Sequence, residues 1–232
     1  MPLDLTIDEL TADFPNFRVA VILAQDLKIA AERPMDLDQE IAAREAACRD
    51  RFAGMGLAEI PGIAMWRDAY KKFGIKKTSY RPSVERLVKN ILAGRSLPVI
   101  NSFVDAYNAI SLAHVFPVGA DDVAKIEPSV AFRYSRAGDS FIPLGKAEPD
   151  PPKTVEVVLA AGSAVLCRRW NWYQDARSPI STETTEALVT IQANGWGDLE
   201  AAAGDLVALL ERFGAARCQV AYASADNSSI RF

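Results

Sequence analysis

The sequence predicts an α+β fold, and two observations support this class. Apolar residues at helical spacing dominate the chain between residues 34 and 113, whereas runs typical of strands dominate between residues 130 and 193. Helices and strands in separate blocks favour α+β over the alternating order of a doubly wound parallel sheet. The chain has no internal repeat and no low-complexity segment, so we expect one domain spanning residues 1–232.

Two strands are expected first. Residues 5–10 have the pattern of a short strand, and residues 17–28 that of a longer strand, whose continuous apolar centre indicates burial on both faces. A helix then follows Pro34. Asp36 and Asp38 stand near its start, and it continues through residues 41–52 to a stop at Gly54.

Three more helices and a block of strands complete the expected elements. The helices are residues 63–73, 83–93 and 103–113, and a glycine ends each of the first two. Strands are expected at residues 130–134, 155–160, 164–169 and 187–193, with prolines and glycines between them. Residues 199–213 form an amphipathic helix and residues 218–222 a last strand. Residues 147–153 are expected to be a loop inside the domain.

Composition excludes several classes of function. The formal net charge of −4 argues against a non-specific nucleic-acid-binding protein, although a local basic groove remains compatible with it. The three cysteines form no CxxC pair and His114 is the only histidine, so we expect no disulfide framework, no metal site and no cofactor. A Ser-His-Asp triad would need His114, which lies at a helix end where a structural role is more common. We expect no membrane partner and a cytoplasmic location, because no apolar run approaches 18 residues and no signal-like segment opens the chain.

Two polar clusters are candidates for a binding site. In residues 101–108 (NSFVDAYN), helical spacing places Asp105 and Asn108 on one face, where they either serve a pocket or brace loops. Residues 167–175 (CRRWNWYQD) concentrate arginines, which recognise carboxylate or phosphate, with tryptophans that stack on bases or line a pocket. The alternative for this second cluster is a buried Trp pair, with arginines paired to acids.

Two further clusters are less specific. Residues 181–185 (STETT) begin like a helix-capping box, but their hydroxyls would also suit a pocket wall. A basic patch spans residues 70–86 and includes Arg81 and Arg86, and it either tracks an RNA backbone or is a solvated helix face. Its lysines are Lys71, Lys72, Lys76 and Lys77.

In this order, the segments resemble the tRNA-binding and editing domain, the third and fourth B modules, of the phenylalanyl-tRNA synthetase beta subunit. The resemblance covers roughly residues 63–193 and rests on LPVINSFVDAYNAISL, FPVGADDVAKI and STETTEALVTIQA. A free-standing branch of this family is more similar still, through WRDAYKKFG at residues 66–74 and CRRWNW at residues 167–172. The resemblance implies layered mixed β-sheets with helices packed outside.

The resemblance also implies an activity, namely hydrolysis of the ester that joins a wrong amino acid to tRNA. Because that ester is activated, a site can act by positioning water and polarising the carbonyl, without a covalent nucleophile. Two departures change the expected specificity. Gly119, two residues after Pro117, replaces a histidine of the synthetase pattern, and Thr190 replaces a glutamate that reads the amino acid's side chain. We therefore expect a different or smaller amino acid.

We hypothesise a trans-acting aminoacyl-tRNA deacylase, a hydrolase of translation quality control whose partners are tRNA or aminoacyl-tRNA and possibly a free amino acid. The alternative is a non-catalytic module that binds tRNA or an amino acid. The residues expected to act in catalysis are Asn101, Asp105, Asn108 and Asn171. Those expected to bind substrate are Arg168, Arg169, Trp170, Trp172, Thr184, Thr185, Thr190, Pro117 and Gly119, with Lys71, Lys72, Lys76 and Lys77 on RNA.

Overall fold

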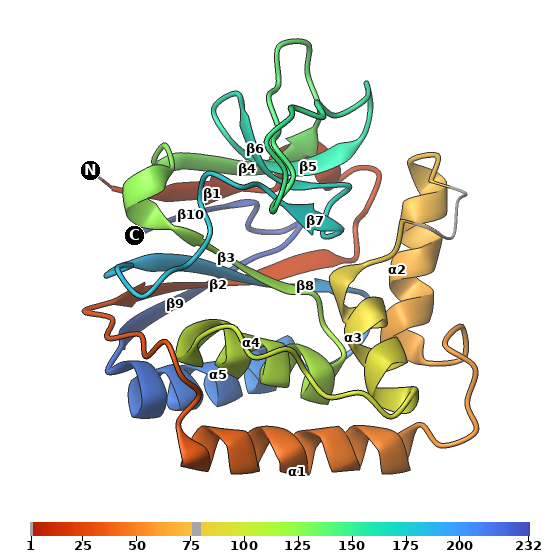
Figure 1. The fold of residues 1–232 in the computed structure, drawn as a ribbon. Helices are drawn as coiled ribbons and strands as arrows, with labels where there is room; N and C mark the ends of the chain where they lie inside the picture. The colour runs from red at the N-terminus through yellow and green to blue at the C-terminus, as the bar shows by residue number, and fades with distance from the viewer. Residues whose placement is uncertain (1, 76–79) are drawn as a thin grey trace.

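The computed structural model describes residues 2–75 and 80–232, and over these residues two β-sheets and a group of five α-helices stack in layers (Figure 1). The α+β class is confirmed. The strands are β1 (Asp4–Thr6), β2 (Phe17–Gln25), β3 (Val118–Asp122), β4 (Ser129–Tyr134), β5 (Val157–Ala161), β6 (Ala164–Arg168), β7 (Tyr173–Gln174), β8 (Ala187–Asn194), β9 (Arg217–Ala223) and β10 (Ser229–Arg231). The helices are α1 (Met35–Arg51), α2 (Pro61–Lys72), α3 (Ser83–Leu92), α4 (Ser102–His114) and α5 (Leu199–Gly214).

The two sheets differ in composition. One runs β10-β1-β4-β5-β6-β7 and is mixed, because β1 pairs with β4 in parallel and its other pairs are antiparallel. The other runs β3-β8-β2-β9 and is antiparallel throughout. In Figure 1 the six-stranded sheet lies above the four-stranded sheet. Helices α4 and α5 lie beneath the four-stranded sheet, with α1 below them, and α2 and α3 stand at the right-hand end. The expected layers with helices outside are therefore present.

Strand β2 explains why the four-stranded sheet is the middle layer. Val19 and Val21 point to the six-stranded sheet, whereas Ala20 and Ile22 point to the helices, and all four are buried. Where every position of a strand is apolar, both of its faces carry apolar side chains. Each face is then buried only if another layer covers it, so such a strand is stable between two layers. The expected burial of β2 on both faces is confirmed.

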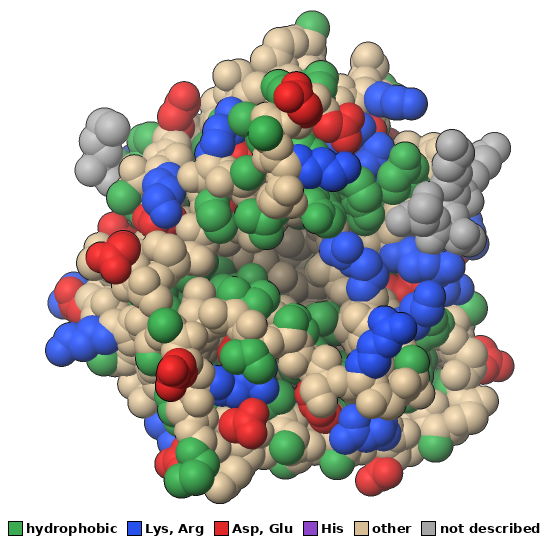
Figure 2. Space-filling model, viewed as in Figure 1, with side chains coloured by type: hydrophobic (Ala, Val, Ile, Leu, Met, Phe, Trp, Pro, Cys, Tyr) green, Lys and Arg blue, Asp and Glu red, His purple; other side chains and the backbone are tan. Residues whose placement is uncertain are grey.

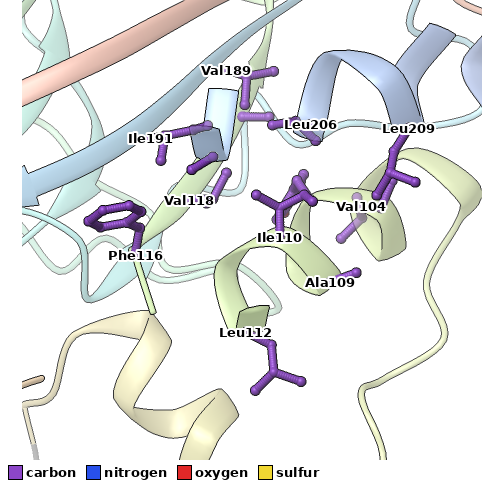
Figure 3. Packing of buried hydrophobic residues seen from close by; sticks show 14 of the residues in the cluster. Val104, Ala109, Ile110, Leu112, Phe116, Val118, Val189, Ile191, Leu206 and Leu209 are labelled. Atoms are coloured by element: carbon purple, nitrogen blue, oxygen red, sulfur yellow. The ribbon is translucent and has the colours of Figure 1, made fainter. Parts of the chain in front are cut away.

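Helix α4 is buried on nearly all sides. The side chain of Asn101 caps its start by accepting a hydrogen bond from the Val104 backbone N–H at 2.9 Å, and Val115, in the left-handed conformation, ends it. Figure 3 shows Ile110 of α4 among residues of β8 and α5, such as Val189 and Leu206. This packing fixes the position of the remaining face of α4, which carries polar residues.

Several expected elements differ in extent. Residues 5–10 were expected to be one strand, but β1 ends at Thr6 and a 3-10 turn (Asp8–Leu10) follows. The strand expected to begin at residue 155 begins at Val157, because Val155 has a φ of 64° and leaves the extended conformation. Strand β3 and the short strands β7 and β10 were not expected. The aspartates of β3 hide the apolar pattern by which a buried strand is recognised.

Candidate functional site

A cleft opens at the β3 edge of the four-stranded sheet, where the six-stranded sheet meets α3 and α4. Its volume is about 380 Å³, within the range of small-molecule sites. Figure 2 shows a hollow in this part of the molecule, with Lys and Arg side chains gathered on its right-hand side, over α2 and α3 in the matching view of Figure 1. The lining residues used below are Arg86, Tyr107, Asn108, Gly119, Asp121, Cys167, Asn171, Trp172, Gln174, Thr190 and Gln192.

A chain of hydrogen bonds runs along one wall of the cleft. The Tyr70 hydroxyl donates to Oδ1 of Asn171 at 2.9 Å, and Nδ2 of Asn171 donates to Oε1 of Gln192 at 3.1 Å. Nε2 of Gln192 in turn donates to Oγ1 of Thr190 at 3.2 Å. All four residues are buried, so each bond excludes competing water and holds the next side chain in place.

An unusual turn brings Asn171 to this wall. Arg169 and Trp170, directly after β6, have φ angles of 48° and 66°, a left-handed conformation that costs on the order of 1 kcal/mol or more in each non-glycine residue. Trp170 then lies in the core, with its ring centroid 4.8 Å from that of Phe17 and 5.1 Å from that of Trp66. The core packing of Trp170 offsets the strain, and the next residue, Asn171, lines the cleft.

Asp121 of β3 is a buried carboxyl in the cleft. Oδ1 accepts a hydrogen bond from the Ser178 hydroxyl at 2.6 Å and a longer one from Nε2 of Gln174 at 3.4 Å. Burial raises the pKa of Asp121 to about 6, and the nearby charge of Asp175 adds to the rise, while the two donors oppose it. The cleft therefore contains a carboxyl group that titrates near neutral pH.

The Cys167 thiol and the Tyr107 hydroxyl of the cleft are held neutral. Burial raises the pKa of the Cys167 thiol to about 12, so it is not a thiolate at neutral pH. Burial also raises the pKa of the Tyr107 hydroxyl well above its usual range. His114 lies at the end of α4 and its Nε2 is 2.9 Å from Oδ2 of Asp205, outside the cleft. The described cleft residues thus offer amides, hydroxyls, one carboxyl and, from Arg86, one guanidinium.

Five residues predicted to act in the site line this cleft together. They come from four segments that are distant in sequence, namely α4, β3, the turn after β6, and β8. They are Asn108, Gly119, Asn171, Trp172 and Thr190. The structure therefore brings Asn108 of α4 and part of the 168–172 segment to one place, while the roles assigned to these residues stay predictions.

Asn101 and Asp105 do not line the cleft, and this corrects their expected placement. Asn101 is committed to the helix cap. Asp105 is fully buried, where its Oδ2 accepts a hydrogen bond from Nε of Arg33 at 3.0 Å and its Oδ1 one from the Ile100 N–H at 3.0 Å. Of the two alternatives left open by the sequence, these two residues follow the second, since they brace the segment that leads into α4.

Arg168, Arg169 and Trp170 also lie outside the cleft lining. Arg168 donates to both oxygens of Glu156, at 2.8 and 3.0 Å. The Arg169 guanidinium lies 3.7 Å from the ring centroid of Tyr80 and 4.4 Å from that of Trp172, with Glu156 at 3.3 Å. Ion pairs and core packing thus occupy Arg168 and Trp170. Arg169 instead supports Trp172, which does reach the cleft.

The remaining predicted residues serve local structure. Oγ1 of Thr184 accepts from the Ser181 N–H at 3.0 Å and donates to Oδ2 of Asp122 at 2.8 Å, which is a capping role rather than a pocket role. Thr185 is exposed and Pro117 is buried, where its carbonyl accepts from the Gln192 N–H at 3.0 Å. These placements correct the expectation that the three line the pocket.

The predicted RNA patch is only partly described. Lys71 is exposed and its Nζ lies 2.9 Å from Oδ1 of Asp68, which offsets its charge. Lys72 is exposed, with its Nζ 5.9 Å from the ring centroid of Phe14. Lys76 and Lys77 lie outside the described residues. The described part of the patch therefore offers one lysine without a carboxylate partner among the described residues.

Sequence reasoning missed four residues of the cleft. Gln192 and Asp121 carry hydrogen bonds there, and Tyr107 and Arg86 contribute to its lining. All four belong to segments that the sequence singled out, but none was assigned a role in the site. Gln192 has one available signal, because a glutamine two residues after a threonine in an apolar strand places two polar groups on one buried face. Asp121, the first aspartate of FPVGADDVAKI, offers no comparable signal without knowledge of strand β3.

The described residues include neither a candidate metal site nor a candidate membrane-spanning helix. Within residues 2–75 and 80–232, no group of His, Cys, Asp and Glu side chains is arranged to hold a metal ion. None of the helices in the described part of the chain has the length and apolar character needed to cross a membrane.

Comparison with known proteins identifies the class. The B3/4 domain family model matches residues 65–196, more than half of the chain. The chain therefore belongs to the B3/4 domain family, and the expected resemblance to a module of the phenylalanyl-tRNA synthetase beta subunit is confirmed.

An N-terminal fragment of the phenylalanyl-tRNA synthetase beta subunit from Pyrococcus horikoshii is similar with 14% sequence identity and a TM-score of 0.47. The match covers 92% of this chain and 49% of that one, so the chain spans about half the length of the fragment. No curated protein matches the chain.

Proposed function

We propose that the chain is a trans-acting aminoacyl-tRNA deacylase that hydrolyses mischarged tRNA in the cytoplasm. The observation that carries the proposal is the row of buried hydrogen bonds from Tyr70 through Asn171 and Gln192 to Thr190 along a cleft of about 380 Å³. Membership of the B3/4 domain family and the resemblance to a synthetase editing domain support the reaction class.

The row of hydrogen bonds suits ester hydrolysis by positioned water. Asn171 and Gln192 each use one amide N–H within the row and keep a second N–H free to donate. The Thr190 hydroxyl accepts from Gln192 and keeps its own hydrogen for another acceptor. Such donors can polarise an ester carbonyl and orient a water molecule without a covalent nucleophile, which matches a cleft whose thiol is protonated.

The cleft supports an amino-acid specificity different from that of the synthetase domain. A Cβ built on Gly119 meets no atom within 4 Å, so a larger side chain there would project into open space. Gly119 pairs with Thr190 in the sheet, and these are the two positions where the synthetase pattern has histidine and glutamate. The cleft therefore lacks two large polar side chains at neighbouring positions, and its selectivity must depend on other groups.

The rim of the cleft offers a path for RNA. Arg86 lines the cleft and is exposed, and Lys89 is exposed one turn further along α3. Figure 2 shows Lys and Arg side chains gathered beside the hollow. Because the whole chain carries a net charge of −4, a basic rim would localise a polyanion at the cleft rather than across the surface.

A panel of mischarged tRNAs tests the proposal. Purified protein should release the amino acid from at least one mischarged tRNA at a rate well above spontaneous deacylation. If the protein accelerates deacylation of none of these mischarged tRNAs, the proposal that it is an enzyme is refuted.

A non-catalytic module that binds tRNA or an amino acid is the second candidate. It is favoured by one observation: neither a histidine nor a thiolate lines the described cleft. This candidate predicts saturable binding of aminoacyl-tRNA with no loss of the ester. The same panel, with binding measured in parallel, separates the two.

A further inference from the structure

Asp121 differs from the other buried acids of the described chain. Among the described residues, eight acidic side chains are buried, and seven of them lie within 4 Å of an arginine or lysine nitrogen. The paired acids are Glu45, Glu85, Asp105, Asp122, Asp139, Glu156 and Asp175. Asp121 has no cationic partner among the described residues, and it is also the one that lines the cleft with its neighbours on β3.

The hydrogen bonds of Asp121 leave one oxygen free. Both the Ser178 hydroxyl and the Gln174 amide donate to Oδ1, and no described residue donates to Oδ2. A buried carboxylate without a cation is unfavourable, and two neutral donors on one oxygen offset only part of this cost. The site therefore favours any ligand that brings a positive charge to Oδ2.

The surroundings of Asp121 suit an ammonium group rather than a metal ion. The described residues offer no second or third carboxylate, thiolate or imidazole arranged as metal ligands. The cleft also has apolar walls, from residues such as Val104, Leu159 and Leu166. A ligand with one cationic head and a small or apolar body would satisfy both features, and every α-amino acid ester has this form.

The position of Asp121 relative to the amide row fits such an ester. Gly119 pairs with Thr190 and Asp121 pairs with Leu188, so Asp121 lies two residues along the same face of β3 as Gly119. Two residues of a strand span about 6.6 Å. This separation leaves room for an ammonium nitrogen on Asp121 and the adjacent ester carbonyl on the Thr190–Gln192 side.

We propose that Asp121 binds the α-ammonium group of the aminoacyl moiety, so that the cleft selects cationic α-amino acyl groups over their uncharged counterparts. The assignment rests on the proposed function for the identity of the ester, but its chemistry requires only an ammonium group beside a carbonyl. Ser178 acts as a positioning residue, because it lies outside the cleft lining and orients the carboxylate through Oδ1, to which Gln174 also donates.

Binding of non-hydrolysable analogues tests this assignment without turnover. The probes are 3'-aminoacylamido-3'-deoxyadenosines with small, β-branched and aromatic side chains, each compared by calorimetry with the counterpart in which a hydroxyl replaces the α-amine. At least one amine probe should bind, and its hydroxyl counterpart should bind about 30-fold more weakly or worse, since a buried charge pair is lost. Absence of binding by every amine probe, or equal binding of both members of each pair, would overturn the assignment.

A pair of variants localises the effect. Asp121→Asn should abolish the preference for the amine probe, because the amide keeps Oδ1 as acceptor for Ser178 and Gln174 but carries no charge. The matched control is Asp122→Asn, which changes the next residue of β3 outside the cleft lining and should keep the preference. A preference that persists in Asp121→Asn would also refute the assignment, and the wild-type comparison stands even if a variant unfolds.

The outcome is distinguishable from failure of the proposed function. If the enzyme hypothesis is wrong, the esters in the tRNA panel will stay intact. The probes carry an amide in place of the ester, so they report binding alone. Selective binding without deacylation would therefore keep the Asp121 assignment and favour the binding module. Deacylation of mischarged tRNA without a preference for the amine probes would keep the enzyme hypothesis and refute the Asp121 assignment.

Discussion

Nδ2 of Asn171 donates a hydrogen bond to Oε1 of Gln192 at 3.1 Å, which joins the turn after β6 in one sheet to β8 in the other. Both residues are buried, and both line the cleft. The relative position of the two sheets at this edge therefore depends on a polar contact as well as on apolar packing. Changes to this contact should affect the cleft more than the fold.

Asn171→Ala removes the central member of the hydrogen-bond row. We expect deacylation to fall by about 100-fold, which is the usual effect of losing one preorganised donor beside a reacting carbonyl. Single-turnover release of the amino acid measures the effect. Asn194→Ala, at the end of β8 and outside the cleft lining, is the matched control and should react at the wild-type rate. A similar fall in both variants would contradict a specific role.

Tyr70→Phe tests whether Asn171 is held in place. The hydroxyl of Tyr70 does not line the cleft but donates to Asn171, so its loss should lower the rate by roughly 3–10-fold while leaving a phenyl ring in the core. A positioning role predicts a lower kcat with little change in KM. A change in thermal stability alone, with both constants unaltered, would mean that the hydroxyl only stabilises the fold.

The two tryptophans of the 168–172 segment should respond differently to removal. Trp170→Ala empties a fully buried site packed against Phe17 and Trp66, and we expect a loss of about 3–5 kcal/mol in the free energy of unfolding. Trp172→Ala should lower stability less, because its side chain is only partly buried, yet weaken ligand binding. Urea denaturation and probe binding measure the two effects, and equal destabilisation would contradict the contrast.

The residue types predicted that the 168–172 segment contributes to the site, but not that its two tryptophans occupy different environments. Two tryptophans two residues apart would face the same side of a regular strand. The left-handed conformation of Arg169 and Trp170 breaks that rule, so Trp170 enters the core and Trp172 the cleft edge. Nothing in the residue types reports those φ angles. The apolar run of β2, by contrast, specified its place in the middle layer because burial on both faces has few other solutions.

Asp121 is a second residue whose place in the cleft the residue pattern did not predict. Asp121 and Asp122 are neighbours with opposite surroundings, since Asp122 accepts a hydrogen bond from Thr184 and lies 2.9 Å from Lys125, whereas Asp121 faces the cleft. Their difference follows from the strand geometry of β3, which places successive side chains on opposite faces. Because β3 itself was not expected, neither was this division.

Stability should depend on pH through Asp121. Its pKa is about 6 in the folded protein against 3.8 for an ordinary aspartate, so the folded state favours the protonated carboxyl. This contribution is fully present below about pH 4 and is lost as the pH rises through 6. Asp121→Asn should therefore unfold at a higher temperature than wild type at pH 8, with the advantage shrinking toward pH 4.

The groups around Asp121 set the interpretation of that experiment. Asp175 raises its pKa, Cys167 and Tyr107 are protonated neighbours, and Arg86 stands at the rim of the cleft. Thermal melts of both proteins between pH 4 and pH 8 give the difference directly. A difference that is constant over this range would mean that Asp121 does not titrate with the pKa inferred from its burial.

The rim of α3 should contribute more to RNA affinity than the described lysines of α2. Arg86→Ala with Lys89→Ala should weaken tRNA binding and reduce the slope of log affinity against log salt by about 2, one for each lost phosphate contact. Lys71→Ala with Lys72→Ala should have a smaller effect, because Asp68 already offsets Lys71. Filter binding over a range of salt concentrations compares the pairs, and equal effects would place the RNA across both helices.

Deacylation of mischarged tRNA by the wild-type protein and by Asn171→Ala, assayed side by side over a panel of amino acids, tests the central claim most directly. The account predicts that at least one ester is cleaved well above its spontaneous rate by the wild type and about 100-fold more slowly by the variant. Esters that persist in the presence of the wild-type protein, or an equal rate with both proteins, would contradict it.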